Sequence, residues 1–282
     1  MKNTYRVINF HVTNPCNYAC RYCFGKFKGE PLPASHALRV VDGIADYFRD
    51  SSVSQGRINL AGGEPLLYPA LDGLIEAICQ KGLAVSIITN GSLLTPARIE
   101  AWRGKVACIG LSVDALTPAV NRAIGRCSGG EALGLPHWTA LAEACHRCGI
   151  PLKINTVVSR LNLSEDLRPL YRACQPQRIK LMRMHLVEGV NDPARPLAVT
   201  DGEFEDFCQR HAEFAPRTVR ENRGSMEDSY LMVAPDGRVL LNHRGAYQDY
   251  GSCLRESFSA IVTRLPLDRA KYAARYGKEA EA

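Results

Sequence analysis

The sequence predicts an α/β fold with parallel strands, arranged as a partial barrel or an open sheet. Over the first 190 residues, short runs rich in β-branched residues alternate with longer segments of helical periodicity, giving six strand–helix units. Strands that alternate with helices pair in parallel through right-handed crossovers. Six units are fewer than the eight that close a full barrel, so a partial barrel or an open parallel sheet is expected.

Each element follows from its own stretch of sequence. The six predicted strands cover residues 6–12, 57–62, 84–89, 106–113, 152–158 and 179–187. The helices between them are expected near residues 35–50, 70–82, 96–102, 135–148 and 164–174. Together these elements define residues 1–190 as the parallel α/β part of the chain.

Residues 191–282 are predicted to form a C-terminal extension of the same globular unit, because the strand–helix alternation stops there. Thr200, with Glu203 three residues later, predicts the capped start of a helix. The run "SYLMVAPDGRVLL" predicts a β-hairpin that turns through Pro235, Asp236 and Gly237. The tail "AKYAARYGKEAEA" favours a helix, but it is polar and is expected to fray.

Composition excludes several classes of protein. The chain has 282 residues, of which 46% are hydrophobic and 23% charged, as in an ordinary globular domain. Eleven cysteines at irregular spacings, with no signal-peptide layout, do not resemble a secreted disulfide framework and indicate a reducing cytoplasm. No run approaches the length of a transmembrane helix. The net charge of +6 suits an anionic small ligand and does not require nucleic acid.

Three cysteines in "NPCNYACRYCF" are the strongest local signal. Cys16, Cys20 and Cys23 lie within eight positions, directly after the first predicted strand. A structural zinc site needs a fourth protein ligand, and His11 is the nearby candidate. A [4Fe–4S] cluster held by three cysteines leaves one iron open. The missing fourth ligand is then a substrate or a cofactor.

The motifs around this loop resemble those of the radical S-adenosylmethionine (SAM) enzymes. "CNYACRYC" has the CxxxCxxC spacing of that superfamily, with an aromatic residue before the third cysteine. "AGGEP" after the second strand is similar to its GGE motif, and "TNGS" follows the third strand. The resemblance implies a partial (β/α)6 barrel that binds a [4Fe–4S] cluster and SAM.

Longer segments resemble one branch of the superfamily, the viperin family of antiviral nucleotide-modifying enzymes. These segments are "INFHVTNPCNYACRYCF", "INLAGGEPLL", "LSVDALTPAVNRAIGR", "LKINTVVSRLNLSEDL" and "MEDSYL". The match runs from about residue 7 to residue 260. The N-terminal amphipathic helix and the Trp-ended tail of the animal proteins are missing, so the chain resembles a soluble, prokaryotic member of the family.

The resemblance implies a role for each matched residue of the cofactor site. The cluster ligands would be Cys16, Cys20 and Cys23, with SAM chelating the open iron. Small residues at the GGE motif let the backbone approach SAM closely. The residues implied to bind SAM are Tyr22, Gly62, Gly63, Glu64, Asn90, Ser112 and Arg126.

The substrate that the resemblance implies is a ribonucleoside triphosphate, whose negative charge calls for fixed cations at the barrel mouth. The residues implied to contact it are Asn9, Thr13, Arg57, Lys153, Asn155, Arg178 and Lys180. Two positions depart from the family pattern. Arg57 stands where the family carries lysine, and Ala61 replaces a serine near the substrate, so one hydrogen bond is lost or comes from water.

The implied reaction converts the triphosphate into its 3′-deoxy-3′,4′-didehydro analogue. The 4′ hydrogen is abstracted and the 3′ hydroxyl leaves as water, which produces a chain-terminating antiviral nucleotide. Tyr230, in "DSY", is a candidate catalytic or lid residue. CTP and UTP are the favoured substrates, and GTP is a further possibility, because bases are discriminated by a few hydrogen bonds that sequence does not reveal.

Two other functions compete with this interpretation. Another radical SAM enzyme, acting on a peptide or a cofactor precursor, would share the cysteines and the GGE motif but would not need the basic residues. A zinc-binding interaction protein would explain the cysteines alone. Cys145 and Cys148 end a helix without a second pair and are interpreted as half-buried thiols, and Cys208 and Cys253 are too few for a second cluster.

The predicted protein is a cytoplasmic monomer that works without nucleic acid or a membrane. Its partners are the nucleoside triphosphate and a reducing partner such as flavodoxin or ferredoxin, which the radical SAM resemblance implies.

Overall fold

The computed structural model describes residues 5–27, 30–53 and 55–276, and the chain divides into two compact units. Unit 1 comprises residues 1–15, 25–87 and 224–282, and unit 2 comprises residues 16–24 and 88–223. Each unit contains both early and late parts of the chain, so neither coincides with the predicted division at residue 190. That predicted division stays a prediction.

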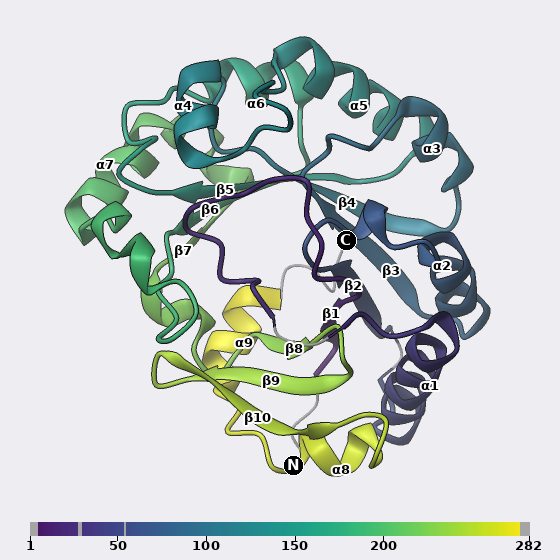
Figure 1. The fold of residues 1–282 in the computed structure, drawn as a ribbon. Helices are drawn as coiled ribbons and strands as arrows, with labels where there is room; N and C mark the ends of the chain where they lie inside the picture. The colour runs from purple at the N-terminus through teal and green to yellow at the C-terminus, as the bar shows by residue number, and fades with distance from the viewer. Residues whose placement is uncertain (1–4, 28–29, 54, 277–282) are drawn as a thin grey trace. The chain divides into compact units, whose positions relative to one another are not determined.

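Unit 1 combines the first strands of the chain with the C-terminal extension (Figure 1). Its strands are β1 (Val7–His11), β2 (Arg57–Ala61), most of β3 (Ala84–Thr89), β8 (Leu231–Val233), β9 (Arg238–His243) and β10 (Ala246–Ser252). Its helices are α1 (Ala34–Asp50), α2 (Leu71–Gln80), α8 (Phe258–Val262) and α9 (Arg269–Tyr276).

The strands of unit 1 follow the order β10-β9-β8-β1-β2-β3. β1, whose five residues are all buried, pairs in parallel with β2, so that His11 lies opposite Ala61. β8 pairs in parallel with the other edge of β1 and antiparallel with β9. The predicted hairpin is therefore confirmed, and the extension adds its strands directly to the first strand of the chain.

Helices α1 and α2 lie side by side next to these strands (Figure 1). Val40, Ile44 and Tyr47 of α1 are buried and recur at helical spacing, which gives the helix one apolar face. Leu71, Leu74 and Ile78 form the corresponding buried apolar face of α2, and their burial fixes the helix against the core of the unit.

The expectation of a frayed tail is wrong for residues 270–276, which belong to α9. Tyr272 and Tyr276 of α9 are four residues apart, share one helical face and are both buried. The Tyr272 hydroxyl accepts hydrogen bonds from the backbone N–H groups of Arg6 and Val7, at 2.6 and 2.8 Å. Two aromatic anchors thus fix a helix whose composition is polar. Residues 277–282 of the predicted tail lie outside the described residues.

Unit 2 contains the remaining strand–helix pairs. Its strands are β4 (Val106–Ser112), β5 (Leu152–Val158), β6 (Arg178–Arg183) and β7 (Thr218–Glu221). Its helices are α3 (Pro96–Ala101), α4 (Pro118–Ile124), α5 (Leu135–Cys148), α6 (Arg168–Cys174) and α7 (Asp201–Arg210). The four strands pair in parallel in the order β4-β5-β6-β7.

Unit 2 departs from the predicted elements in four places. α4 and β7 are not predicted, because each is short and carries polar residues that hide its periodicity. β6 ends at Arg183 rather than at residue 187. α6 begins at Arg168 rather than near residue 164, because Pro169 favours the first turn of a helix. The predicted capping box is confirmed: Thr200 and Glu203 exchange hydrogen bonds at the start of α7.

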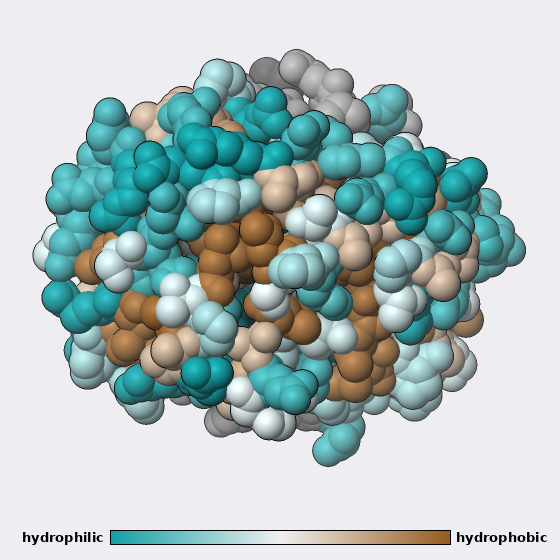
Figure 2. Space-filling view, turned by 90° about the horizontal axis from the view of Figure 1, so that it is seen from above, coloured by the Kyte–Doolittle hydropathy of each residue, from teal (hydrophilic) through white to brown (hydrophobic). Residues whose placement is uncertain are grey.

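The described surface is mainly polar. Hydrophilic residues cover most of the face in Figure 2, and hydrophobic residues form several patches among them. Only Leu38, Leu67 and Leu93 are exposed large hydrophobic residues within the described chain. None of the described helices is long and apolar enough to cross a membrane.

We expect Tyr272→Phe to lower the free energy of unfolding by about 2 kcal/mol, because the buried N–H of Val7 and the partly buried N–H of Arg6 lose their acceptor. Denaturant unfolding measures this loss. Tyr250→Phe, which removes a hydroxyl from a partly exposed residue of β10, is the control and should change stability by less than about 0.5 kcal/mol. Equal effects of the two substitutions would contradict the proposed anchoring role.

Candidate active site

The three cysteines predicted to hold a cluster lie on the short loop of unit 2, residues 16–24. Cys16 is exposed, and Cys20 and Cys23 are partly buried. The Cys16 sulfur accepts a hydrogen bond from the backbone N–H of Tyr18 at 3.4 Å. The Cys20 sulfur accepts one from Nη1 of Arg126, also at 3.4 Å. The Cys16 and Cys20 thiols therefore have donors of the kind that stabilise thiolates.

The cysteine loop offers three thiols to a metal site. No group of three His, Cys, Asp or Glu side chains among the described residues is arranged to hold one metal ion. A single zinc ion needs such convergence. A [4Fe–4S] cluster does not, because each thiolate binds a different iron. The donor set of three thiols on one loop fits such a cluster, with one thiolate for each of three irons.

The cysteine loop is held by the turn that ends α4. The N–H of Ala19 donates to the carbonyl of Gly125 at 3.0 Å, and that of Arg21 donates to Ile124 at 2.9 Å. Gly125 has φ +90°, and a Cβ there would lie 2.3 Å from the Ala19 carbonyl oxygen. Only glycine fits this close approach.

Asn90 ties the same loop to the end of β3. Its Nδ2 donates to Oδ1 of Asn17 at 2.9 Å and lies 3.9 Å from the Cys16 sulfur. Its own Oδ1 accepts from the N–H and hydroxyl of Ser92, at 2.9 and 2.6 Å. The residue is 7% exposed, so its amide is fixed beside the first cysteine.

Arg126 is the most constrained of the residues predicted to bind SAM. Its Nη2 donates to the backbone carbonyl of Ser112, and its Nε lies 3.1 Å from Oδ2 of Asp114. Tyr22 donates its hydroxyl to the same carboxylate oxygen and is buried. The structure thus brings Tyr22, Ser112 and Arg126 together around one buried acid. Burial raises the pKa of the Cys20 thiol, and the adjacent guanidinium opposes that rise.

The GGE motif belongs to unit 1 and follows β2. The N–H groups of Gly63 and Glu64 donate to the carbonyls of Thr13 and Pro15, at 2.7 and 2.8 Å. A Cβ at Gly62 would lie 2.5 Å from the Thr13 oxygen, and one at Gly63 would lie 2.2 Å from the Pro15 oxygen. The glycines therefore let two backbone segments touch. The fully buried Glu64 accepts from the N–H of Leu66 at 3.2 Å.

The basic residues of unit 2 share one face of β5 and β6. Lys153 lies opposite Arg178, and Asn155 lies opposite Lys180, so the four side chains occupy alternate positions of paired strands. Both lysines are less than 10% exposed. Arg178 is the first residue of β6 and Lys153 the second of β5. Lys153 and Arg178 therefore lie near the amino ends of their strands, and the expected location of these cations at the barrel mouth stays a prediction.

β4 completes this polar face. Gly110 pairs with Lys153, and Ser112 pairs with Asn155. A Cβ at Gly110 would lie 3.2 Å from Cε of Lys153 and 3.1 Å from Nδ2 of Asn155, so glycine leaves room for both side chains. One continuous face therefore joins Ser112, beside Arg126, to the buried lysines.

A buried ion pair balances part of the positive charge. The ammonium group of Lys180 lies 2.5 Å from Oε1 of Glu221, the last residue of β7. Their side chains are 7% and 4% exposed. The attraction between the two ions offsets the cost of their desolvation. Because Glu221 adds a negative charge, the face carries less net charge than its cations alone suggest.

The other predicted substrate residues belong to unit 1. Asn9 is buried and donates to the Leu231 carbonyl and the Tyr276 hydroxyl, at 3.0 and 3.1 Å. Arg57 is the first residue of β2 and is partly buried. The guanidinium carbon of Arg275 lies 4.7 Å from the ring centre of Tyr230. Tyr230 is thus held by a cation–π contact, and its predicted catalytic role stays a prediction.

His11 is a buried histidine that sequence analysis considered only as a zinc ligand. Both ring nitrogens are buried without a hydrogen-bond partner within the described residues. Its ring packs edge-on against Phe27, with centroids 4.6 Å apart. Burial lowers the pKa of His11 to about 3, so the imidazole is neutral at physiological pH.

A family model described as the Radical SAM superfamily matches residues 10–174, more than half of the chain. The "S-adenosylmethionine-dependent nucleotide dehydratase" of Selenomonas ruminantium is 35% identical over 95% of this chain and 98% of its own length. One from a Thermoplasmatales archaeon is 34% identical over 84% of this chain and 83% of its own length. The chain belongs to the S-adenosylmethionine-dependent nucleotide dehydratases of the radical SAM superfamily. The predicted viperin-like membership is thereby confirmed.

Animal members of this nucleotide dehydratase family are also similar. The "S-adenosylmethionine-dependent nucleotide dehydratase RSAD2" of Oncorhynchus mykiss is 27% identical over 96% of this chain and 79% of its own length. Family membership makes this chain a radical SAM enzyme and favours that class over a zinc-binding interaction protein.

Solved structures confirm the predicted fold class. Streptococcus suis SuiB bound to S-adenosylmethionine matches with a TM-score of 0.67 and 14% identity, over 96% of this chain and 67% of that one. The protein titled "Native anSMEcpe with bound AdoMet and Cp18Cys peptide" matches with the same score and identity, over 94% and 81%. The nucleotide dehydratase therefore has the α/β fold of radical SAM proteins, with added C-terminal antiparallel strands.

Sequence analysis missed three residues that lie next to predicted site residues of the dehydratase: Asp114, Gly110 and Glu221. Asp114 follows Ser112 in "LSVDA", where an acid directly after a buried strand was the available signal. Gly110 lies in the same strand, and a glycine inside a strand can mark a close approach. Glu221 had no signal, because β7 was not predicted and only its pairing brings the residue to Lys180.

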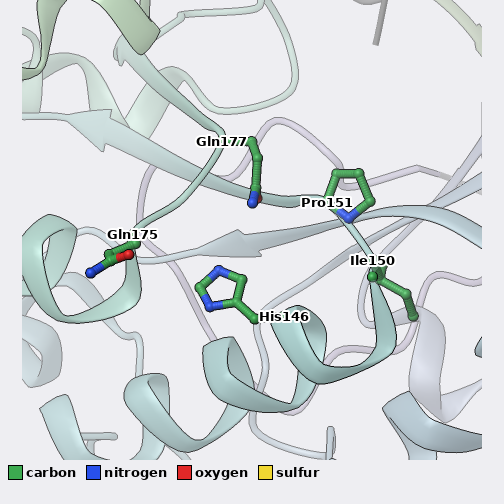
Figure 3. Close-up of a pocket in the computed structure, with 6 residues that line it drawn as sticks. His146, Ile150, Pro151, Gln175 and Gln177 are labelled. Carbon is green, nitrogen blue, oxygen red and sulfur yellow. The ribbon is translucent and has the colours of Figure 1, made fainter.

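Other polar features lie apart from this site. A surface pocket is lined by His146, Gln175, Gln177 and their neighbours (Figure 3), near the amino ends of β5 and β6, and contains none of the predicted residues. Cys145 and Cys148 are buried free thiols, and burial raises the pKa of Cys145 to about 12. Both residues are therefore more deeply buried than the half-buried thiols that the sequence predicts.

Proposed function

We propose that this enzyme converts a ribonucleoside triphosphate into its 3′-deoxy-3′,4′-didehydro analogue, with loss of the 4′ hydrogen and of the 3′ hydroxyl as water. The observation that carries the proposal is the single face of β4, β5 and β6. It joins Ser112, at the expected SAM site, to the buried basic side chains of Lys153 and Lys180. A peptide substrate would not require buried cations at that place.

In this proposal Cys16, Cys20 and Cys23 hold a [4Fe–4S] cluster. Their place on one loop, and the N–H donors to the Cys16 and Cys20 sulfurs, fit that group. When bound, the cluster and SAM supply a 5′-deoxyadenosyl radical, the species that removes a hydrogen atom from the substrate.

SAM is proposed to bind the residues that the family resemblance implies, in the GGE motif and around Arg126. The glycines of the GGE motif keep side-chain atoms away from the backbone at Thr13 and Pro15. Glu64 would bind the amino group of the methionine part, because it is the acid of that motif. Tyr22, Asn90, Ser112 and Arg126 would line the remainder, and the Arg126 guanidinium suits a carboxylate.

The triphosphate would bind to Lys153, Arg178 and Lys180, with Asn155 as a neutral donor and Arg57 as a fourth cation. About four negative charges require several fixed cations in a site of low exposure. Glu221 holds the Lys180 ammonium in place before the phosphate arrives. Binding at several points fixes the ribose relative to SAM, and this orientation lowers the barrier to hydrogen transfer.

Asn9, Thr13 and Tyr230 are proposed to contact the ribose or to close the site. CTP and UTP are the favoured substrates, and GTP is a further candidate. The balanced conversion takes up SAM, two electrons and one proton, and yields the didehydro nucleotide, water, methionine and 5′-deoxyadenosine. A reducing partner such as flavodoxin or ferredoxin would supply the electrons.

Replacing any one of Cys16, Cys20 or Cys23 with alanine should abolish SAM cleavage, because one iron loses its thiolate. Iron content and 5′-deoxyadenosine are measured after anaerobic reconstitution. Cys145→Ala, which removes a buried thiol from α5, is the matched control and should keep both. Loss of SAM cleavage in the control, with its cluster assembled, would contradict the assignment.

Lys153→Ala should weaken triphosphate binding by about 1.5–3 kcal/mol, because a charge-assisted contact is lost. Lys180→Ala should do the same and should also destabilise the fold, because it leaves Glu221 buried without its cation. Calorimetric titration with CTP and with SAM separates the effects. A matching loss of SAM affinity in Lys153→Ala would mean that the lysine supports the fold.

The reaction is tested with all four ribonucleoside triphosphates, SAM and a reductant under anaerobic conditions. Deuterium placed at the 4′ position of the accepted substrate should appear in 5′-deoxyadenosine, and mass spectrometry should show a product lighter by the elements of water. Transfer from 3′ or 5′ deuterium, or no transfer from any triphosphate, would rule the proposal out.

A further inference from the structure

Asp114 is a buried acid that the predicted site does not include. It lies two residues beyond the end of β4 and is 1% exposed. Oδ1 accepts the backbone N–H of Val157 at 2.7 Å, which leaves Oδ2 for side chains. Oδ2 lies 3.1 Å from Nε of Arg126 and accepts the hydroxyl of Tyr22. Both oxygens are therefore engaged, and a buried charge has a buried partner of opposite sign.

Arg126 distributes its guanidinium over three acceptors. Nε faces Asp114, Nη1 donates to the Cys20 sulfur at 3.4 Å, and Nη2 donates to the Ser112 carbonyl. The N–H groups of arginine form a rigid planar fork, so fixing one edge fixes the directions of the others. The Ser112 carbonyl and a protonated Cys20 thiol are neutral acceptors, whereas the Asp114 carboxylate is charged. Asp114 therefore sets the orientation of the Arg126 guanidinium.

The carboxylate also restrains the cysteine loop itself. Tyr22 lies between Cys20 and Cys23 in sequence, and its hydroxyl reaches the same Oδ2 that faces Arg126. The backbone carbonyl of Tyr22 accepts Nδ2 of Asn191 at 3.0 Å, which fixes the residue from the other side. One acid thus connects the loop that carries the thiols with the arginine that touches one of them.

We infer that Asp114 is a positioning residue for SAM, acting through Arg126 and Tyr22. This inference rests on the proposed function. The carboxylate holds the guanidinium between the Cys20 sulfur and Ser112, where it would bind the SAM carboxylate and donate to the cluster ligand. Without that carboxylate the guanidinium loses its counter-ion and the acceptor that fixes its plane.

The test uses Asp114→Asn, Asp114→Glu and a control in anaerobically reconstituted full-length protein. Asparagine has one oxygen and one NH₂ group, so it cannot accept from Val157 on one side and from Arg126 and Tyr22 on the other. Asn162→Ala is the matched control. It removes hydrogen bonds to the backbone carbonyls of Asp114 and Val157, at 2.8 and 3.0 Å, without touching the carboxylate.

Two measurements are made without nucleotide: the SAM dissociation constant per loaded cluster, and the electron paramagnetic resonance spectrum of the reduced cluster with and without SAM. Asp114→Asn should raise the dissociation constant by about tenfold or more and diminish the spectral change caused by SAM. Asp114→Glu should recover part of the affinity. Asn162→Ala should lower the melting temperature but leave the dissociation constant within about twofold of the wild type.

Wild-type SAM affinity and spectra in Asp114→Asn, with a lowered melting temperature, would overturn the inference, because the acid would then support only the fold. If Asp114→Asn does not fold, Tyr22→Phe decides. This substitution removes the hydroxyl that donates to Oδ2 of Asp114, so the SAM dissociation constant should rise by about threefold. An unchanged dissociation constant would overturn the inference. Absence of SAM binding by the wild type would instead contradict the proposed function.

Discussion

The structure of unit 2 depends on how buried charge is compensated along a parallel sheet. Its strands carry cations in positions that are almost closed to water, and an unpaired buried charge is costly. Two acids meet this requirement for two of the cations: Asp114, two residues beyond β4, faces Arg126, and Glu221, at the end of β7, faces Lys180. Arg126 and Lys180, which would bind anionic ligands, are therefore each held by an acid before any ligand is bound.

The two ion pairs serve different parts of the proposed chemistry. The Asp114–Arg126 pair lies beside Cys20 and Ser112, at the expected cofactor end of the face. The Lys180–Glu221 pair lies at the same level of the sheet but two strands away from β4, because Ser112 pairs with Asn155 and Asn155 with Lys180, and it lies among the residues proposed to bind phosphate. A ligand carboxylate or phosphate that binds Arg126 or Lys180 would share that cation with Asp114 or Glu221, or displace the acid from it. The pairs thus limit how far each cation can move.

Close contacts between backbone segments also fix the structure, and glycines make them possible. Gly62 and Gly63 allow the segment after β2 to touch Thr13 and Pro15, and Gly125 allows the end of α4 to touch Ala19. In each case a Cβ would lie less than 3 Å from a backbone oxygen. Side chains could not be tolerated there without moving the backbone. Within unit 1 these contacts fix the segment that precedes the cysteine loop, and within unit 2 they fix the loop itself.

The sequence by itself determined the strand–helix alternation, the hairpin, the capping box and the family. These depend on local periodicity or on contiguous motifs such as "CNYACRYC", so the residues that carry them are neighbours in the chain. Only the tertiary structure decided that β8 pairs with β1, that the tail helix is anchored by Tyr272, and that Glu221 meets Lys180. These contacts join residues far apart in sequence, and strand pairing and register, which local patterns do not encode, bring them together.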